Sequence, residues 1–268
     1  MKFTVVQPDY PSTDASTCMA WMSAQLDTLK SGEQDIVLLP EYANTPAIDE
    51  QDALRACAET AGAEFLQNVA ASAKRLGFLI ATGAVVREGA QWFNRTLVFD
   101  ASGDVVFHYD KIHLTTTESR DLALSAGSTS PIFEYQGIRI GFATCFDLYF
   151  PEHFTALAAQ QVDLILCPSY QRSESAERIR LIAQMRALDT GCYLARSSYA
   201  MPAPDHGGHS LIAAPDGSLI AETGNTAGMI IAEFDPHQKF TKPASHGQPS
   251  VEHRALIESH RRPETYPK

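Results

Sequence analysis

The sequence predicts a single α/β domain in which two β-sheets pack together and helices cover both outer faces. Three observations favour this fold. Short apolar runs typical of buried strands recur along the chain, helical patterns separate some of them, and Gly-containing turns join others into hairpins. The chain has 268 residues, 44% of them apolar, so it can bury a sizeable core, and no linker or short repeat divides it.

The first half of the chain is expected to alternate strands and helices and then to form a hairpin. Met19, Met22 and Leu26 share one stripe of the first helix, and the turn Ala101-Ser-Gly-Asp104 joins the last two strands. The expected strands are 3–7, 35–39, 78–86, 92–99 and 105–109, and the expected helices are 15–29 and 53–76, the second interrupted near Gly62.

The second half repeats this order of elements. Gln136-Gly137 joins two strands, Pro151 opens a helix, and Gly191 ends the next helix. The expected strands are 132–135, 138–144, 162–167, 193–198, 209–214, 218–221 and 229–234, and the expected helices are 151–159 and 176–190.

Two segments do not fit the alternation of strands and helices. Residues 115–130 are polar and show no periodicity, and loops of this length in compact domains are often functional. Residues 235–268 are polar and rich in Pro and His, so they cannot build a core alone. We expect this C-terminal tail to lie across another surface.

Composition excludes several classes of protein. The formal net charge is −11, and the only dense basic stretch is His260-Arg-Arg262, so no nucleic-acid groove is expected. No apolar run reaches the roughly 18 residues of a membrane span. Five widely spaced cysteines without a CxxC pair argue against a disulfide framework or a zinc site and for a reducing compartment. Because the N-terminus enters a strand pattern without a signal peptide, we expect a cytoplasmic protein.

Three side chains that are suited to catalysis each follow an apolar, strand-like run: Glu41, Lys111 and Cys145. A carboxylate can accept a thiol proton, a thiolate can attack a carbonyl, and an ammonium can stabilise the oxyanion that forms. Because α/β folds commonly place their sites at one end of a sheet, the three side chains can converge. Taken singly, each has a structural alternative: a small buried apolar residue, a solvated strand end or a surface charge.

Four motifs surround these residues. They are Leu39-Pro-Glu41, Tyr109-Asp-Lys-Ile-His-Leu114, Thr144-Cys-Phe-Asp-Leu-Tyr-Phe-Pro-Glu152, and Gly208-His-Ser-Leu-Ile212 followed by Pro215-Asp-Gly217. In this order and spacing the chain resembles the nitrilase, or carbon–nitrogen hydrolase, superfamily, from Phe3 to about Phe234. The resemblance implies a four-layer α-β-β-α sandwich and no cofactor. It also implies a homodimer or higher homo-oligomer, with the tail 235–268 at the dimer interface.

The resemblance also implies a role for each catalytic candidate. Cys145 matches the nucleophile, Glu41 the general base, and Lys111 the oxyanion-stabilising lysine. Glu118 matches a second glutamate that orients the substrate and the lysine. The reaction is then attack of the thiolate on an amide carbonyl, with the backbone N–H of Phe146 helping to hold the oxyanion, followed by hydrolysis of a thioester.

Other residues near the motifs are assigned by chemistry and position. The candidates for lining the substrate pocket are Tyr42, Asn44, Phe146, Tyr149 and Tyr170. His113 is expected to make a structural hydrogen bond, and Arg186 and Asp189 are spaced for an ion pair on a helix. No metal site is expected at His206 and His209, and Cys167 and Cys192 are expected to be structural.

The function that the sequence favours is hydrolysis of a small amide or an N-carbamoyl compound, with water as the second substrate. One alternative is a nitrilase, although members that hydrolyse nitriles usually carry Trp-Glu after the nucleophile and this chain has Phe146-Asp147. Acyl transfer is disfavoured because the membrane-bound acyltransferases of the superfamily need spans that this chain lacks. A catalytically silent binding protein is a further alternative. Tyr149 stands where many members that bind acidic substrates have Arg, and Arg120 or Arg172 can compensate.

Overall fold

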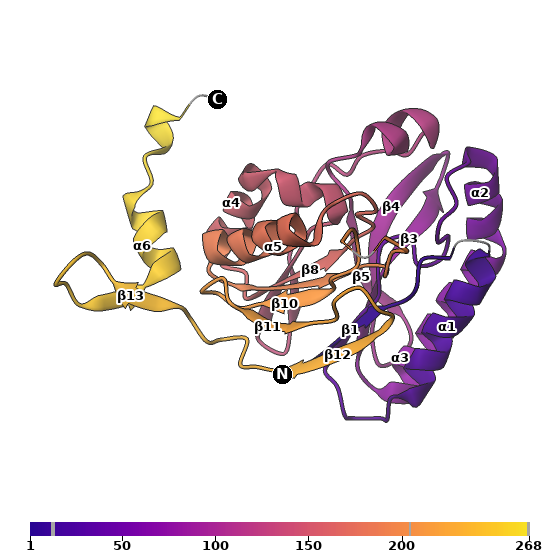
Figure 1. Cartoon of the computed structure of the whole chain (residues 1–268), viewed down its shortest axis with the longest axis horizontal. Coiled ribbons are helices and arrows are strands. Elements are labelled where there is room, and N and C mark those ends of the chain that lie inside the picture. Colours follow the sequence, from indigo (N-terminus) through magenta and orange to yellow (C-terminus); the bar gives the residue numbers. More distant parts are fainter. Residues whose placement is uncertain (12–13, 204, 267–268) are drawn as a thin grey trace.

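Two six-stranded sheets lie face to face between helices in the computed structural model, which describes residues 1–11, 14–203 and 205–266 (Figure 1). The layer between the sheets is built from apolar residues of both, among them Val5, Leu38, Phe142 and Leu166. This arrangement confirms the predicted two-sheet core.

The first sheet has the strand order β12-β1-β2-β3-β4-β5. Neighbours β1, β2 and β3 are parallel, whereas the remaining pairs are antiparallel. β2 is entirely apolar and β1 is buried from Phe3 to Gln7, because both faces of these parallel strands are covered. The bounds are β1 Lys2–Gln7, β2 Ile36–Leu38, β3 Leu79–Glu88, β4 Gln91–Phe99, β5 Val105–Asp110 and β12 Gly228–Glu233.

The second sheet has the order β11-β10-β9-β8-β7-β6 and the same mixture of pairings, with β7, β8 and β9 parallel. Its strand β10 is shorter than expected, because His209 adopts a left-handed backbone conformation (φ 50°) and the strand begins only at Leu211. The bounds are β6 Phe133–Tyr135, β7 Ile138–Phe142, β8 Leu164–Pro168, β9 Tyr193–Ser197, β10 Leu211–Ala213 and β11 Leu219–Glu222.

Helices complete the two outer layers. α1 (Ala15–Thr28) and α3 (Ala61–Leu76) pack on the outer face of the first sheet, and α4 (Pro151–Ala159) and α5 (Ala176–Thr190) pack on the outer face of the second. Figure 1 shows the first pair of helices on one side of the strands and the second pair on the other. The predicted four-layer α-β-β-α sandwich is confirmed.

The interruption expected near Gly62 divides the long helical segment into α2 (Gln51–Glu59) and α3. Gly62 packs closely against the loop that follows β2, because a Cβ atom there would lie 2.4 Å from the carbonyl oxygen of Asn44. The break therefore brings the start of α3 against the loop that carries Glu41.

The polar segment 115–130 is folded locally rather than extended. It contains a π-helical turn, Thr117–Asp121, and the side chains of Leu122 and Leu124 are buried beside it. Such turns are rare and occur frequently at functional sites.

The tail leaves the body after β12 and forms a small hairpin, a helix and a final turn (Figure 1). The beginning of its helix is held by Arg254, which is buried against Gly191 and donates a hydrogen bond to the carbonyl oxygen of Val162. The bounds are β13 Thr241–Pro243, β14 Ser250–Glu252, α6 His253–His260 and a 3₁₀ turn Pro263–Thr265.

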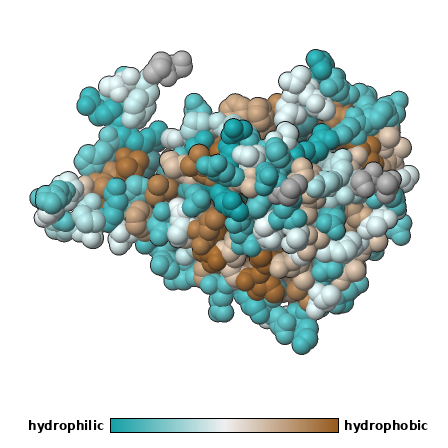
Figure 2. Space-filling model, in the orientation of Figure 1, coloured by the Kyte–Doolittle hydropathy of each residue, from teal (hydrophilic) through white to brown (hydrophobic). Residues whose placement is uncertain are grey.

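The surface seen in Figure 2 is mostly hydrophilic or intermediate, with hydrophobic residues in separate patches. None of the helices in the described ranges is long and apolar enough to cross a membrane.

Candidate active site

Glu41 lies in a loop that is fastened to β3 immediately after β2 ends. The N–H groups of Leu39 and Ala43 donate to carbonyl oxygens of β3, each at 2.8 Å. Beneath the loop lies Gly83, where a Cβ atom would come within 2.5 Å of the Glu41 Cα atom. Only glycine permits this approach, and as a result Glu41 is completely buried.

Lys111 follows the last residue of β5 and points at two carboxylates. Its Nζ atom donates to Oε1 of Glu41 at 2.9 Å and to both carboxylate oxygens of Glu118 at 2.8 Å. The lysine side chain is only 1% exposed, so its charge is balanced inside the protein by these two carboxylates rather than by water.

Glu118 sits on the π-helical turn and accepts hydrogen bonds from several elements. Besides Lys111, the donors are the Tyr42 hydroxyl at 2.9 Å, the Asn94 amide at 2.7 Å and the Thr115 N–H at 2.8 Å. The carboxylate is thus fixed in position on all sides.

Asn94 links the two carboxylates and is a site residue that the sequence did not single out. Its Nδ2 atom donates to Oε1 of Glu41 and to Oε1 of Glu118, each at 2.7 Å. The signal in the sequence is the alternation of side chains along β4. Asn94 lies on the same buried face as Trp92 and is polar where an apolar side chain is expected.

Cys145 opens a 3₁₀ turn, Cys145–Tyr149, just after β7. Its φ of 47° places it in the left-handed region, which is costly for a residue with a Cβ atom and is held by the surrounding structure. Asp147 holds this turn: it accepts hydrogen bonds from the Thr144 N–H and the Tyr109 hydroxyl, each at 2.7 Å, and it also contacts His113. The structural hydrogen bond predicted for His113 is confirmed.

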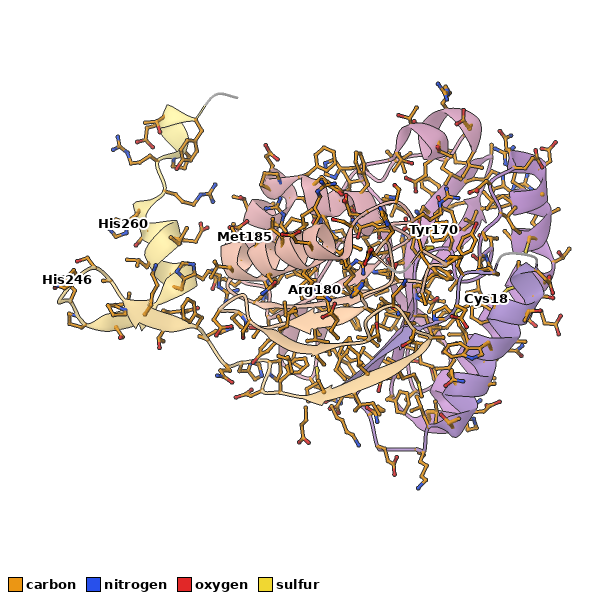
Figure 3. The ribbon with its side chains drawn as sticks, in the orientation of Figure 1. Cys18, Tyr170, Arg180, Met185, His246 and His260 are labelled. Atoms are coloured by element: carbon orange, nitrogen blue, oxygen red, sulfur yellow. The ribbon has the colours of Figure 1, made fainter. Side chains whose placement is uncertain are left out.

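A cavity of about 190 Å³ opens onto the thiol. Two of the three predicted tyrosines, Tyr42 and Tyr170, line it, and so do Glu41, Glu118, Leu122 and Cys145. Tyr170 is visible in Figure 3 within the body of the molecule, far from His246 and His260 on the tail.

Two other predicted pocket residues lie outside this lining. The Tyr149 side chain is 38% exposed and its hydroxyl contacts the Glu174 carboxylate. The Phe146 ring packs on Phe150, with ring centroids 5.2 Å apart. Neither side chain is among the residues that line the cavity, and their contact with substrate stays a prediction. The prediction for the Phe146 backbone N–H is separate and stays a prediction.

The remaining predicted residues take structural positions. Arg186 and Asp189 form an ion pair at 2.8 Å on α5, as expected. Asn44 hydrogen bonds to the backbone of Val85 in β3, at 2.8 and 3.0 Å, and holds the loop that carries Glu41. Cys167 and Cys192 are buried free thiols, and burial raises their pKa values to about 11 and about 12.

The two glutamates that share Lys111 have pKa values shifted in opposite directions. Burial raises the pKa of Glu41, and the attraction of Lys111 only partly opposes it. Burial acts on Glu118 too, but the Lys111 ammonium and the hydrogen bonds to the carboxylate lower its pKa below the ordinary value. Opposite shifts of this kind are the pattern expected of two carboxylates of which one stays ionised and the other exchanges a proton.

The thiol and the lysine complete this electrostatic picture. Burial works to lower the pKa of Lys111, but Glu41 and Glu118 together raise it well above its ordinary value, so the ammonium stays charged. Burial and the nearby Glu41 charge raise the pKa of Cys145, so the resting group is a thiol. Oε2 of Glu41 has no hydrogen-bond partner among the described residues. A free carboxylate oxygen near a neutral thiol is what general base catalysis requires.

Comparison with known proteins identifies the family. The model of a protein family described as carbon-nitrogen hydrolase matches residues 2–238 of the chain. The chain belongs to the carbon–nitrogen hydrolase family. The family and enzyme class that the motifs predicted are therefore confirmed.

Relatives and solved structures of this family agree over most of the chain. A protein named "Hydrolase in pqqF 5'region" from Pseudomonas protegens is 30% identical over 77% of this chain and 74% of its own length. The 2-oxoglutaramate amidase of Bacillus subtilis is 28% identical over 77% of this chain and 80% of its own. The crystal structure of an amidase from Nesterenkonia sp. covers 98% of this chain and 94% of its own, with a TM-score of 0.76 and 18% identity, and it supports the fold.

Proposed function

We propose that this enzyme hydrolyses the C–N bond of a small amide or an N-carbamoyl compound through a thioester on Cys145. The observation that carries the proposal is the shared hydrogen bonding of Lys111 with Glu41 and Glu118, whose pKa values move apart, beside a cavity lined by a thiol. The amidase names of relatives, such as 2-oxoglutaramate amidase, support the same reaction class.

In the first half of the reaction, Glu41 takes the proton of Cys145 as the sulfur attacks the carbonyl carbon. The carbonyl π electrons move to oxygen, and the Lys111 ammonium and the Phe146 N–H hold the resulting anion. Losing one such donor typically costs about 3–4 kcal/mol of transition-state stabilisation. Glu41 then gives its proton to the leaving nitrogen, the C–N bond breaks, and ammonia or an amine departs.

In the second half, water replaces the amine. Glu41 removes a proton from water as its oxygen attacks the thioester carbon, the C–S bond breaks, and the proton returns to sulfur. Glu118 stays ionised throughout and keeps Lys111 charged and in place, as its lowered pKa favours.

The same site favours amides over nitriles. Lys111 is suited to an oxygen anion, which the amide intermediate has and the thioimidate formed from a nitrile lacks. The unpartnered Oε2 of Glu41 can accept a hydrogen bond from an amide NH₂, which a nitrile cannot donate. A site with buried acceptors rejects analogues without the matching donors.

The experiment compares kcat/KM for amide and nitrile pairs with the same carbon skeleton, using ammonia release as the readout. We expect the amide to react faster in every pair. Cys145→Ala should keep the fold, as measured by circular dichroism, and lose turnover. Faster nitrile hydrolysis across several pairs would favour a nitrilase. A Cys145→Ala variant that keeps more than about a hundredth of wild-type kcat would show that Cys145 is not the nucleophile.

We also infer that two chains pair through a surface that includes the tail, and that the enzyme works in the reducing cytoplasm. Exposed apolar side chains support the pairing: Val251, Ile257 and Tyr266 on the tail are 37, 44 and 53% exposed, and Leu181 and Met185 on α5 are 59 and 42% exposed. Light scattering of the full chain should give twice the monomer mass. A purely monomeric species at micromolar concentration would contradict the pairing.

A further inference from the structure

Arg196 is a buried arginine that the proposed reaction leaves without a role. It lies on β9, in register with Cys167 of β8, and its exposed fraction is 0%. Placing an unpaired charge in the interior of a protein costs free energy, so buried charges are normally paired. A guanidinium that is completely buried therefore requires a source of negative charge nearby.

The hydrogen bonds that Arg196 makes with the described residues all go to uncharged oxygens. Its Nε atom donates to Oε1 of Gln171 at 2.9 Å, and Nη1 donates to the carbonyl oxygens of Gly208 and His209 at 2.7 and 3.2 Å. Nη2 has no hydrogen-bond partner within the same part of the chain. The guanidinium is thus held in place, but its hydrogen-bond partners do not neutralise its charge.

The bond to Gln171 connects Arg196 to the segment that contacts the nucleophile. Gln171 is buried and directly follows Tyr170, which lines the cavity. Burial raises the pKa of the Cys145 thiol, and the hydrogen bond from the backbone N–H of Tyr170 is one of the interactions that oppose this rise. Arg196 therefore helps to fix a backbone donor that favours the thiolate.

The positive charge of Arg196 also acts on the reacting groups themselves. Burial lowers the pKa of the guanidinium, and the negative forms of Cys167, Cys145 and Glu41 oppose this lowering, in that order of strength. Cys145 and Glu41 are both buried, so this order means that Arg196 acts more strongly on the sulfur than on the carboxylate. A positive charge in this position favours the state in which the proton has moved from Cys145 to Glu41.

The charges of the active site balance when Arg196 is included. Glu41 and Glu118 are two buried carboxylates, and Lys111 places one positive charge between them. With both carboxylates ionised, one negative charge is left over, and the charge of Glu41 raises the pKa of Cys145. Arg196 adds the second positive charge, so these four side chains together are neutral and the buried guanidinium has its counter-charge.

We propose that Arg196 is a positioning residue for the nucleophile: it fixes the segment that presents the Tyr170 N–H to Cys145, and its charge favours transfer of the Cys145 proton to Glu41. The S–H bond breaks and an O–H bond forms on Glu41, so the sulfur keeps the electron pair that attacks the carbonyl carbon. Arg196 is not among the described residues that line the cavity, so it acts through these groups rather than on the substrate. This inference rests on the proposed reaction at Cys145 and adds to it a residue of β9.

Other ionisable groups face the same residues and contribute to any pH dependence. Glu118 raises the pKa of Cys145, and Lys111 lowers it. The groups around Arg196 are Cys167, Tyr149 with its partner Glu174, and His209, whose ring contacts Glu222 and Arg180. Because substitutions at Arg196 or Gln171 leave all these groups in the protein, a shift between variants reports on the charge of Arg196.

The test measures the rate at which iodoacetamide alkylates Cys145 at a series of pH values, followed by mass spectrometry of the Cys145 peptide. Arg196→Met removes the charge and should raise the apparent pKa of alkylation by about one unit or more, which slows alkylation at neutral pH by about tenfold. Arg196→Lys keeps the charge and should react within about threefold of wild type.

Gln171→Glu tests the charge without removing Arg196. The new carboxylate has nearly the shape of the amide and can accept the same hydrogen bond from Nε, but it neutralises the guanidinium. Alkylation should therefore slow by about tenfold, as in Arg196→Met, whereas the melting temperature should not fall, because the buried charge gains a partner. In both variants kcat for a neutral amide should fall, with KM changed by less than about twofold.

Arg254→Met is the matched control. Arg254 is also a buried arginine, 3% exposed, that donates to a backbone carbonyl oxygen, that of Val162, but it belongs to the helix of the tail. Its loss should lower the melting temperature and leave the pH dependence of Cys145 alkylation unchanged. A destabilised protein and an altered thiol are thereby told apart.

Two results would overturn the role of Arg196: alkylation of Gln171→Glu with the rate and pH dependence of wild type, or equally slow alkylation of Arg196→Lys and Arg196→Met. If alkylation shifts as expected but wild type hydrolyses no amide, the role of Arg196 stands and the proposed reaction fails. If wild type hydrolyses amides and alkylation does not shift, the reaction stands and the role of Arg196 fails.

Discussion

The backbone N–H and the Nδ1 atom of His113 both contact Oδ1 of Asp147, at 3.0 and 2.7 Å. His113 lies two residues after Lys111, and Asp147 lies two residues after Cys145. This pair therefore joins the loop that carries the ammonium to the turn that carries the thiol. Burial acts to raise the pKa of Asp147, but the hydrogen bond from His113 and nearby positive charge lower it, so the carboxylate is ionised and accepts.

Asp147→Asn should weaken this junction. The carboxylate accepts from the backbone of Thr144 and His113, the Tyr109 hydroxyl and the His113 ring, and an amide group would turn a donor toward one of them. Leaving a buried donor unmatched costs about 1–3 kcal/mol, so we expect a lower melting temperature and a larger loss in kcat than in KM. Asp189→Asn is the control, because its ion pair on α5 is partly exposed and should change stability by less than about 1 kcal/mol. Equal effects of the two changes would refute the junction.

Glu118→Gln should lower kcat strongly while Cys145 can still be alkylated. The amide cannot hold Lys111 as the carboxylate does at 2.8 Å, so the oxyanion donor is misplaced, whereas Glu41 keeps its free oxygen. Loss of a well-placed donor corresponds to about a hundredfold or more in kcat. Rapid kinetics with iodoacetamide and an amide substrate measure the two properties separately. Turnover like that of wild type would show that Glu118 does not position the lysine.

The acid limb of kcat/KM should lie above pH 4.5, the ordinary value for a glutamate, because burial raises the pKa of Glu41 and the reaction needs its ionised form. Activity is then lost as the pH falls through the raised value. In Glu118→Gln the limb should move to lower pH. The negative charge of Glu118 raises the pKa of Glu41, and without it the attraction of Lys111, which lowers that pKa, remains. The measurement is a pH profile of both proteins with a neutral amide. A limb that stays in place or moves upward would argue against Glu41 as the base.

Gly83→Ala should damage activity from within the first sheet. The added methyl would lie 2.5 Å from the Glu41 Cα atom and 3.0 Å from the Pro40 carbonyl oxygen, so the loop must move and carry Glu41 with it. Overpacking of this kind costs about 1–3 kcal/mol. Gly228→Ala is the matched control in β12, because nothing lies within 4 Å of its Cβ position. The measurements are the melting temperature and kcat of the two variants. A Gly83→Ala enzyme with unaltered kcat would contradict the inference that Gly83 sets the position of Glu41.

The sequence predicts the strands and the three central side chains well because local pattern determines both. Glu41, Lys111 and Cys145 each follow the end of an apolar run, and the site forms where segments that follow β2, β5 and β7 meet. Asn94 was not predicted, because the side chains that it meets on the buried face of β4 depend on the register with β3 and β5. Phe146 and Tyr149 belong to a 3₁₀ turn that begins at the left-handed Cys145, and neither lines the cavity. A backbone angle at one residue has no periodic signal in the sequence.

The site draws its parts from both sheets. Glu41, Lys111 and Glu118 come from segments attached to the first sheet, and Cys145 and Tyr170 come from segments that follow strands of the second. Each sheet has its own helices, so each half can acquire helix and strand content before the two are docked. Turnover, however, exists only after docking. During refolding, the return of enzymatic rate therefore trails the return of the circular dichroism signal, and the interval between them measures how long the sheets take to meet.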